Sequence, residues 1–381
     1  MVAYAVTVVS IIVVVLSENR SPVKSLAWVT VLLLLPAVGI VLYLFFGRSI
    51  KNTRMISRRN RRRLRRQEEA GKKLRLNKLD VSPSARLLIK LTRSLTGSLP
   101  YSGNDIRVFL SGKAKFDALI DDILHAEKFI NMQYYIIDDD SIGTRVKDAL
   151  LLKAAEGVKV RIIYDHVGSY RTSRAFFKEL KHAGVKVFPF FEVVFPPFGT
   201  RINWRNHRKI CIIDGKVGYI GGMNIAERYI TGGHKFATWR DTHLRIFGPA
   251  VASLQYSFAV DWNFMGQPLI EEDMPTPAEF GNLAPDNVMQ LLTAGPTSQW
   301  TNIAMLFVRA IASAKRRVFI QTPYFLPTEA LLRALQSAAL SGVDVRVMMP
   351  VRSDSRLLTA ASASYINECL KSGMKIYLYN A

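Results

Sequence analysis

The second half of this 381-residue chain repeats the pattern of the first half. Each copy alternates strand and helix signals, which indicates a sheet between layers of helices. A repeat this long predicts two homologous α/β sandwich domains related by pseudo-twofold symmetry. Three pairs of segments carry the repeat at offsets of roughly 185 to 190 residues: 126–133 with 314–321, 157–162 with 342–347, and 180–187 with 370–376.

The alternation of apolar and polar residues predicts the elements of the first copy in detail. A Pro-, Gly- and Asn-rich segment over 266–285 separates the copies and indicates a surface connection. We therefore place a first domain at 101–265 and a second domain at 286–381. The expected strands cover 128–137, 158–165, 185–190, 209–214 and 217–220, and the expected helices cover 142–156 and 171–183.

Two uncharged and mostly apolar runs, 2–16 and 26–46, occupy the N-terminus. About 20 helical residues cross a bilayer core, so the second run is long enough to span it, and its Pro36 and Gly39 are tolerable there. The first run is shorter, which leaves a second span or a buried, re-entrant segment open. It lacks the basic start and the small-residue cleavage site of a secretory signal. We predict a transmembrane hairpin within residues 1–47.

The charge is concentrated directly after the apolar runs. Residues 48–78 contain 14 Lys and Arg against two Glu, which is +12 of the formal net charge of +22. A solvated basic helix is the plainest interpretation, but beside a span such a run marks the cytoplasmic side and attracts anionic lipid. A nucleic-acid partner would favour charge spread over the globular part. We expect a basic juxtamembrane linker over 48–100, an anionic membrane as partner, no nucleic-acid partner, and a multi-pass cell-membrane protein with cytoplasmic domains.

Residues 207–224 carry the chemistry of the first copy. Side chains two apart on a strand share a face, so His207 and Lys209 point together. Asn224 follows the next strand after a Gly-Gly pair that ends at Gly222. An imidazole can attack phosphorus while an ammonium and an amide hold the phosphate oxygens. A lone His near a Lys is more often structural, but this combination predicts a phosphate site.

The whole string, His-x-Lys-x4-Asp-x6-Gly-Gly-x-Asn, resembles the signature of the phospholipase D superfamily. Segments 239–246, 248–250, 261–262 and 27–48 look like the bacterial cardiolipin synthase branch. The resemblance implies two phospholipase D-like α/β sandwich domains and phosphatidyl transfer without a metal or an organic cofactor. It also implies phosphatidylglycerol as donor and acceptor, a phosphohistidine intermediate, and cardiolipin and glycerol as products.

The same resemblance implies roles for individual residues. His207 would be the nucleophile and Lys209 the cation that holds the phosphate. Asn224 and Gly222 would bind the phosphate oxygens. Since no compact cluster of metal ligands stands out in the sequence, we expect no metal.

Two carboxylates complete the catalytic prediction. Asp214 belongs to the motif, but strand parity turns it away from His207, so we expect it to cap the hairpin turn. A nucleophilic His needs an acceptor on its other nitrogen, and Asp241 is our candidate. An ordinary ion pair of Asp241 with Arg240 or Arg245 is the alternative.

Several other groups are interpreted more plainly. The tyrosine-bearing strand ends at 133–135 and 321–324 could line a shared cleft, although core tyrosines are the more common case. The apolar segment 193–198 could dip into the membrane, line an acyl channel or cross the interior. Cys211 and Cys369 are expected to be small buried residues.

The family pattern needs two His-x-Lys motifs, and this sequence contains one. His207 lies 23 residues after Gly184, whereas only eight residues follow the equivalent Gly373. We expect a chain truncated before its second motif, a homodimer that completes the site in trans, or an inactive membrane-binding protein. A lipid hydrolase or nuclease of the same fold is the alternative activity, and a membrane scaffold is the alternative without catalysis.

Overall fold

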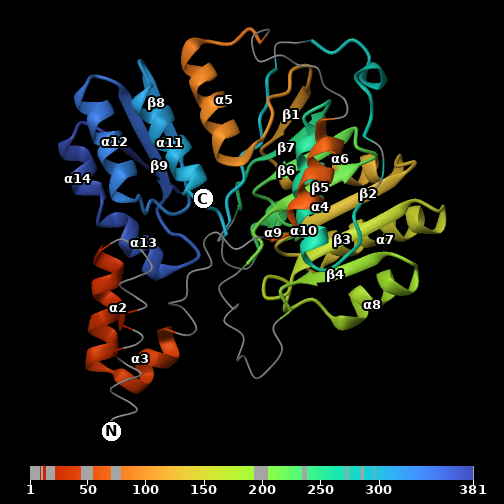
Figure 1. The fold of residues 1–381 in the computed structure, drawn as a ribbon, viewed down its shortest axis with the longest axis horizontal. Helices are drawn as coiled ribbons and strands as arrows, with labels where there is room; N and C mark the ends of the chain where they lie inside the picture. The colour runs from red at the N-terminus through yellow and green to blue at the C-terminus, as the bar shows by residue number, and fades with distance from the viewer. Residues whose placement is uncertain are drawn as a thin grey trace.

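A computed structural model shows two α/β units side by side, with the N-terminal helices next to the smaller unit (Figure 1). Most of the 2–16 run and all of the 193–198 segment lie outside the described residues, so the predictions for them are not addressed. The structure describes residues 9, 12–13, 22–43, 55–69, 79–192, 205–233, 238–270, 272, 274–284, 287–295 and 297–380.

The larger unit is built on a seven-stranded mixed sheet with the order β1-β7-β6-β5-β2-β3-β4. Strands β2, β3 and β4 are mutually parallel, while β5 runs antiparallel to β2 and β6 antiparallel to β5. The strands predicted from the sequence are present, with ends shifted by at most three residues. They are β2 (Phe129–Tyr134), β3 (Lys159–Asp165), β4 (Lys186–Phe190), β5 (Lys209–Ile213) and β6 (Val217–Gly221). The sheet also contains two strands that were not predicted, β1 (Asp105–Phe109) and β7 (His243–Phe247).

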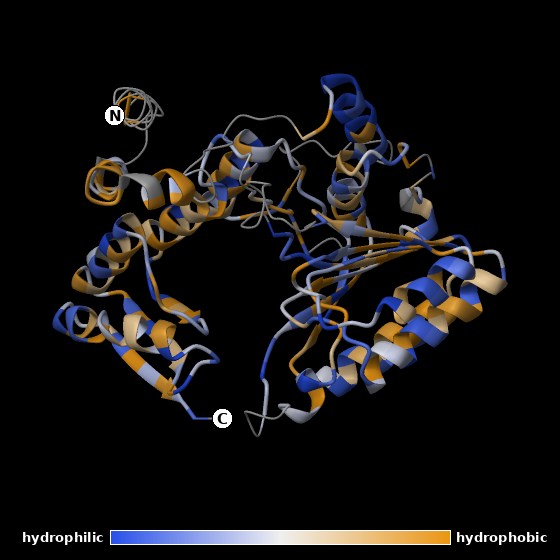
Figure 2. Ribbon diagram, turned by 90° about the horizontal axis from the view of Figure 1, so that it is seen from below, coloured by the Kyte–Doolittle hydropathy of each residue, from blue (hydrophilic) through white to orange (hydrophobic). Residues whose placement is uncertain are grey.

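Helices cover both faces of this sheet (Figure 1). A central strand that is buried on both sides is apolar along its length, and β5 (Lys209–Ile213) is apolar after its first residue. The flanking helices are amphipathic, with a hydrophobic face and a hydrophilic face (Figure 2). One core forms against α6 (Gly112–Leu124), α7 (Ser141–Ala155) and α8 (Arg174–His182), and a second core forms against α4 (Arg58–Glu69) and α10 (Val251–Phe264).

The smaller unit has a parallel three-stranded sheet with the order β10-β9-β8. Its strands follow the repeat signal, because the segments at 314–321, 342–347 and 370–376 lead into them as their counterparts lead into β2, β3 and β4. The two units thus share a β-α-β-α-β order with parallel strands. The elements are α11 (Asn302–Ala312), β8 (Arg317–Gln321), α12 (Glu329–Leu340), β9 (Asp344–Pro350), α13 (Arg356–Ala363), α14 (Ile366–Lys371) and β10 (Lys375–Tyr379).

Two segments tie the units together. The predicted connection contains a 3-10 helix, η3 (Pro277–Phe280), and then pairs with the first unit through the backbone of Met289 and Tyr101. Helix α5 (Pro83–Thr96), whose N-terminus is capped by the Ser82 hydroxyl, stands between the units and contacts α11 (Figure 1).

The prediction of one helix over 26–46 needs correction. Among the described residues this stretch forms two helices, α2 (Pro22–Leu34) and α3 (Pro36–Leu42). Leu35 leaves the helical region because the residue before a proline is sterically disfavoured there. In the part of the chain that the structure describes, no helix has both the length and the apolarity that a bilayer crossing requires.

The basic segment is also more ordered than a linker. Leu64 on α4 is buried against α10, and the Glu68 carboxylate accepts a hydrogen bond from Ser253 on that helix at 2.8 Å. The remaining face of α4 carries exposed arginines. Within 48–100, the structure describes residues 55–69 and 79–100, and there α4 packs on α10 while α5 contacts α11.

Candidate active site

The His-x-Lys pair lies at the start of β5, in the middle of the large sheet. Lys209 Nζ is 3.0 Å from His207 Nδ1 and 2.7 Å from the His207 carbonyl oxygen. The Tyr135 ring, at the end of the neighbouring β2, packs on the imidazole with 4.6 Å between ring centroids. The predicted pairing of His207 with Lys209 is therefore present in the structure.

The electrostatics of this pair favour an uncharged imidazole. Burial and the neighbouring Lys209 ammonium lower the pKa of His207 below 6.5, while Asp165 acts in the opposite direction. Burial lowers the pKa of Lys209 to about 7, opposed by Asp241 and Asp165. Both shifts favour the uncharged form of the side chain concerned, because burial penalises charge on either nitrogen.

Two buried carboxylates fix the segment that precedes β5. Asp165, at the end of β3, accepts a hydrogen bond from the Asn206 backbone N–H at 2.9 Å. Asp261, on α10, accepts from the Asn206 side chain at 2.7 Å and from Gln133 at 2.6 Å, and pairs with Arg208. Sequence reasoning missed both, because these contacts join residues that are 40 to 130 positions apart.

The Gly221-Gly222 pair has a steric role, in addition to the predicted role of Gly222 in binding the phosphate oxygens. A Cβ atom on Gly222 would lie 2.0 Å from Asp241 Oδ1, and one on Gly221 would lie 2.5 Å from the backbone of Thr242 and His243. Glycine at these positions lets the chain after Trp239 pass close to β6. Gly222 is thus the residue that makes room for the Asp241 carboxylate.

Asp241 lies near Lys209 and interacts with it electrostatically. Burial raises the pKa of the Asp241 carboxyl, although Lys209 and the Thr242 backbone N–H counteract this. Among the described residues no hydrogen bond joins Asp241 to the His207 ring, so that partnership stays a prediction. The alternative ion pair with Arg245 is wrong, because Arg245 binds the Asp122 carboxylate at 2.7 and 2.8 Å.

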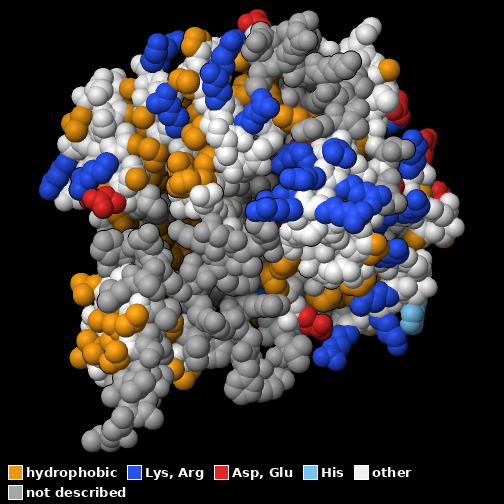
Figure 3. Space-filling view, in the orientation of Figure 1, with side chains coloured by type: hydrophobic (Ala, Val, Ile, Leu, Met, Phe, Trp, Pro, Cys, Tyr) orange, Lys and Arg blue, Asp and Glu red, His pale blue; other side chains and the backbone are white. Residues whose placement is uncertain are grey.

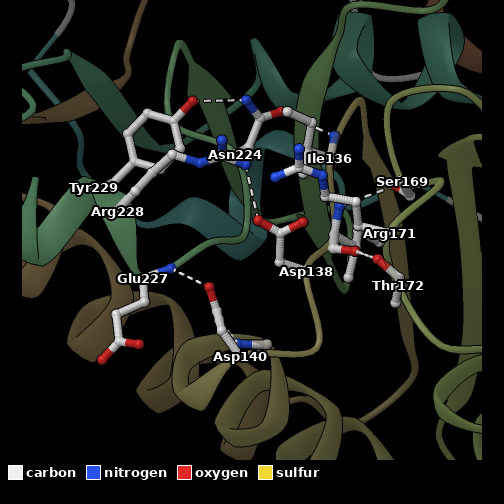
Figure 4. A network of polar contacts seen from close by, with 12 residues as sticks. Ile136, Asp138, Asp140, Ser169, Arg171, Thr172, Asn224, Glu227, Arg228 and Tyr229 are labelled. Carbon is white, nitrogen blue, oxygen red and sulfur yellow. Dashed lines mark hydrogen bonds and ion pairs between the residues drawn. The ribbon is translucent and has the colours of Figure 1, made fainter. Parts of the chain in front are cut away.

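Asn224 is buried in a polar network at the end of β6 (Figure 4). Its Oδ1 accepts from the Ile136 backbone N–H at 3.0 Å, and its Nδ2 donates to the Tyr229 hydroxyl at 2.7 Å. Nearby, Arg228 forms an ion pair with Asp138 at 2.8 Å. One N–H of the amide is thus engaged by the protein, and a carboxamide nitrogen carries two.

Asp214 lies at the opposite end of β5 from His207. Its carboxylate accepts three backbone hydrogen bonds of 2.8 Å, from Glu127, Lys128 and Phe129 just before and at the start of β2. Its own backbone has a φ of 51°, in the left-handed region that Asp tolerates better than most residues. These contacts tie the β5–β6 turn to β2 and are not part of the His207 site.

The remaining candidates divide between core and site. Tyr134, Cys211 and Cys369 are buried, as expected, whereas Tyr135 contacts the imidazole, so the core interpretation of this tyrosine is wrong. Across the units, Arg240 donates to Gln321 at 2.9 Å. Within the described ranges, no three His, Cys, Asp or Glu side chains gather as a metal site would require.

The fold and the position of the His-x-Lys pair define a protein of the phospholipase D superfamily. A phosphatidylserine synthase from Haemophilus influenzae Rd KW20 has a similar fold, with a TM-score of 0.52 over 76% of this chain and 79% of the other at 13% identity. The family model described as "Cardiolipin synthase, PLD-like domain" matches residues 119–259 and 307–381, and the model described as "Phospholipase_D-nuclease N-terminal" matches residues 5–48.

The chain belongs to the cardiolipin synthase family of this superfamily, whose members are phosphatidyltransferases. It is 38% identical to a cardiolipin synthase of Halalkalibacterium halodurans over 99% of this chain and 76% of the relative. It is also 38% identical to the major cardiolipin synthase ClsA of Bacillus subtilis (strain 168), over 97% of this chain and 78% of that protein. The chain thus spans about three quarters of the length of these relatives.

Proposed function

We propose that His207 of this phosphatidyltransferase carries the phosphatidyl group between two molecules of phosphatidylglycerol. A ring nitrogen of His207 attacks the phosphorus, a P–N bond forms, and the P–O bond to the glycerol headgroup breaks. The released alkoxide takes a proton and leaves as glycerol. A hydroxyl of the second phosphatidylglycerol then loses its proton and attacks the phosphohistidine, which frees His207 and yields cardiolipin.

One observation carries this proposal: the His207 imidazole lies 3.0 Å from the Lys209 Nζ at the edge of a cavity, where burial lowers the pKa of the imidazole. A neutral ring keeps the lone pair that the attack requires. The phosphate diester is an anion, and its approach favours the charged form of Lys209. Arg205 and Arg208 line the same cavity. Each is paired with a buried carboxylate, Asp165 and Asp261 respectively, and each guanidinium has further N–H donors that a phosphoryl group could use.

Supporting roles follow for three neighbours of the pair. We assign the second N–H of the Asn224 amide to a phosphate oxygen. Asp241, whose carboxyl pKa is raised by burial, accepts a proton from Lys209 or the imidazole as the charge on the site changes. Gly222 acts by admitting the Asp241 carboxylate next to Lys209.

The proton for the leaving glycerol must come from the side of the phosphate opposite His207, because nucleophile and leaving group lie in line. We assign it to a second His-x-Lys motif across a pseudo-twofold axis, in the same protein or in a partner copy. A partner copy would make the specific activity rise with protein concentration. A motif in the same protein would leave the specific activity constant.

We further propose that the protein acts on a membrane that it enters through a hairpin formed by residues 2–16 and 26–46. Figure 3 shows the hydrophobic residues of α2 and α3 and the arginines of α4 on the same side of the molecule. Exposed apolar residues on α2 include Val23, Leu26 and Leu34, which water would not favour. Arginines beside an apolar anchor bind anionic headgroups, and this supports a cytoplasmic position for the two units.

The decisive experiment incubates the full-length protein with phosphatidylglycerol vesicles and separates the lipids. We expect cardiolipin and an equal amount of free glycerol. Phosphatidic acid instead would indicate hydrolysis by water, and unchanged lipid would indicate a scaffold. His207→Ala should abolish turnover, whereas the matched control His125→Ala, on an exposed histidine, should keep it.

The intermediate can be tested separately. Phosphatidylglycerol labelled in its acyl chains should leave label on the protein after rapid denaturation, bound through an acid-labile phosphoramidate. The label should map to the peptide that contains His207 and should be missing in His207→Ala. Label on another residue with normal cardiolipin formation would refute the nucleophile assignment.

A further inference from the structure

A single cavity extends from the His207 site into an apolar region. Its volume is about 420 Å³, within the range of about 300–1,000 Å³ that ligand pockets occupy. At one end lie His207, Lys209 and the two arginines of the site. Most of the remaining wall is apolar, and its large side chains come from the end of β4, from α10, from the segment before α11 and from α11: Phe190, Phe191, Phe264, Leu291, Leu292 and Ile303.

The aromatic part of this wall is built rigidly. The rings of Phe190 and Phe191 are 4.6 Å apart, and those of Phe191 and Phe264 are 5.4 Å apart. Phe191 has a φ of 50°, a backbone conformation that a bulky residue adopts only when its surroundings hold it. This strained conformation places the Phe191 ring in the cavity wall, which indicates a preformed apolar site.

Four uncharged polar side chains also line the cavity: Asn206, Ser257, Thr293 and Thr297. The Ser257 side chain lines the cavity, is buried, and has an Oγ with no hydrogen-bond partner among the described residues. A buried hydroxyl without a partner is unfavourable, so a ligand that brings an acceptor would be favoured there. Ester carbonyl oxygens are acceptors, and a glycerophospholipid carries two of them close to its phosphate.

We infer that this cavity binds an acyl chain of the phosphatidyl donor, with the adjacent ester carbonyl on the Ser257 hydroxyl. The inference rests on the proposed function for the position of the phosphate at His207. A ligand with its phosphate there and its acyl chain along Phe264, Leu292 and Ile303 matches the change from a charged to an apolar wall. The cavity thus selects for a long apolar chain on the donor lipid.

Filling the cavity tests this assignment in the full-length protein. Leu292→Trp and Ile303→Trp should raise KM for dipalmitoyl phosphatidylglycerol at least tenfold and change KM for the dihexanoyl lipid less than threefold, with kcat retained. This contrast follows because each buried methylene is worth about fourfold in affinity, the equivalent of about 0.8 kcal/mol. The matched control is Leu340→Trp, on the exposed face of α12. Equal effects on both lipids, or none, would overturn the inference.

The serine is tested with a second pair of substrates. Ser257→Ala should weaken the use of ester-linked phosphatidylglycerol about fivefold to tenfold and leave the ether-linked analogue unaffected, because the analogue has no carbonyl to bind. The same loss for both lipids would mean that Ser257 only supports packing.

A binding readout separates this inference from the proposed function. Phosphatidylglycerol with a photoreactive diazirine at the end of one chain should cross-link to the peptides that contain Leu292 or Ile303, in the wild type and in His207→Ala. Cross-links elsewhere, in an enzyme that still makes cardiolipin through His207, would refute the acyl site alone. Cross-links at these peptides without any cardiolipin would refute the proposed function and leave the acyl site standing.

Discussion

Asp214 belongs to the signature string, yet its contacts assign it to the stability of the large sheet. Its two carboxylate oxygens accept from the backbone N–H groups of Glu127, Lys128 and Phe129. It also adopts a left-handed backbone conformation with a φ of 51°. A series of three substitutions, Asp214→Asn, Asp214→Gly and Asp214→Ala, separates these two contributions.

The magnitudes follow from the exposure of the three donors. Two of the hydrogen bonds are exposed, so water can replace them, while the bond from the partly buried Phe129 N–H is worth about 1.5–3 kcal/mol as a bond to a charged group. Alanine adds about 1–2 kcal/mol for the left-handed conformation, which glycine adopts freely and asparagine tolerates. We expect losses of about 1 kcal/mol for Asn, about 2 for Gly and about 4 for Ala.

The assay has two parts. Thermal unfolding of the detergent-solubilised protein, followed by tryptophan fluorescence, should give midpoints in the order wild type, Asn, Gly, Ala. Cardiolipin formation below these midpoints should stay within about threefold of wild type, since Asp214 touches neither His207 nor Lys209. An Asp214→Asn protein that unfolds like wild type but loses turnover a hundredfold would refute this reasoning and restore a catalytic role.

Three further predictions concern the site and the core beneath it. The kcat/KM profile should be bell-shaped. It should fall on the acid side as His207 protonates, at a lower pH than for an ordinary histidine, and fall above about pH 7 as Lys209 loses its charge; Lys209→Arg should remove the alkaline limb. Gly222→Ala should lower turnover at least tenfold by displacing Asp241, but should not lower turnover further when Asp241 is already replaced by Ala. Additive losses of turnover would contradict the claim that Gly222 acts through the Asp241 carboxylate. Lys115 is fully buried, and burial lowers its pKa from 10.5 to about 7. Between these pH values the unfolded chain binds more protons than the folded chain, so the free energy of unfolding of the wild type should rise with pH across that window. The free energy of unfolding of Lys115→Met should not depend on pH in this window, and at pH 7 it should exceed that of the wild type by about 4 kcal/mol. Urea titrations at several pH values measure both effects.

Local periodicity was enough to predict strands β2 to β6 of the large sheet and the pairing inside the motif, but not the strands β1 and β7. Strand parity placed His207 and Lys209 on one side and turned Asp214 away, because both facts depend only on the two-residue repeat of a strand. The internal repeat predicted a second copy of the strand and helix pattern, and β8, β9 and β10 follow the repeated segments. Short-range rules therefore describe the scaffold well.

Long-range contacts were beyond those rules. Nothing local in the sequence connects Asp165 or Asp261 to Asn206, and the ring contact of Tyr135 depends on the register between β2 and β5. The same holds for Gly222, whose role is visible only once the Asp241 carboxylate is found in the space of its missing Cβ. The break at Leu35 had a local signal in Pro36, which the overall hydropathy of the run outweighed in the prediction.

Helix α10 connects the two halves of the proposed substrate site. Ser257, Asp261 and Phe264 follow at intervals of four and three residues, so they lie on one face of that helix. Asp261 holds the segment that carries His207, while Ser257 and Phe264 line the cavity that we assign to the acyl chain. One rigid helix thereby fixes the distance between the nucleophile and the wall that would position the lipid. A substitution that shifts α10 along its axis should therefore change phosphate chemistry and chain preference together, whereas one that only fills the cavity should change chain preference alone.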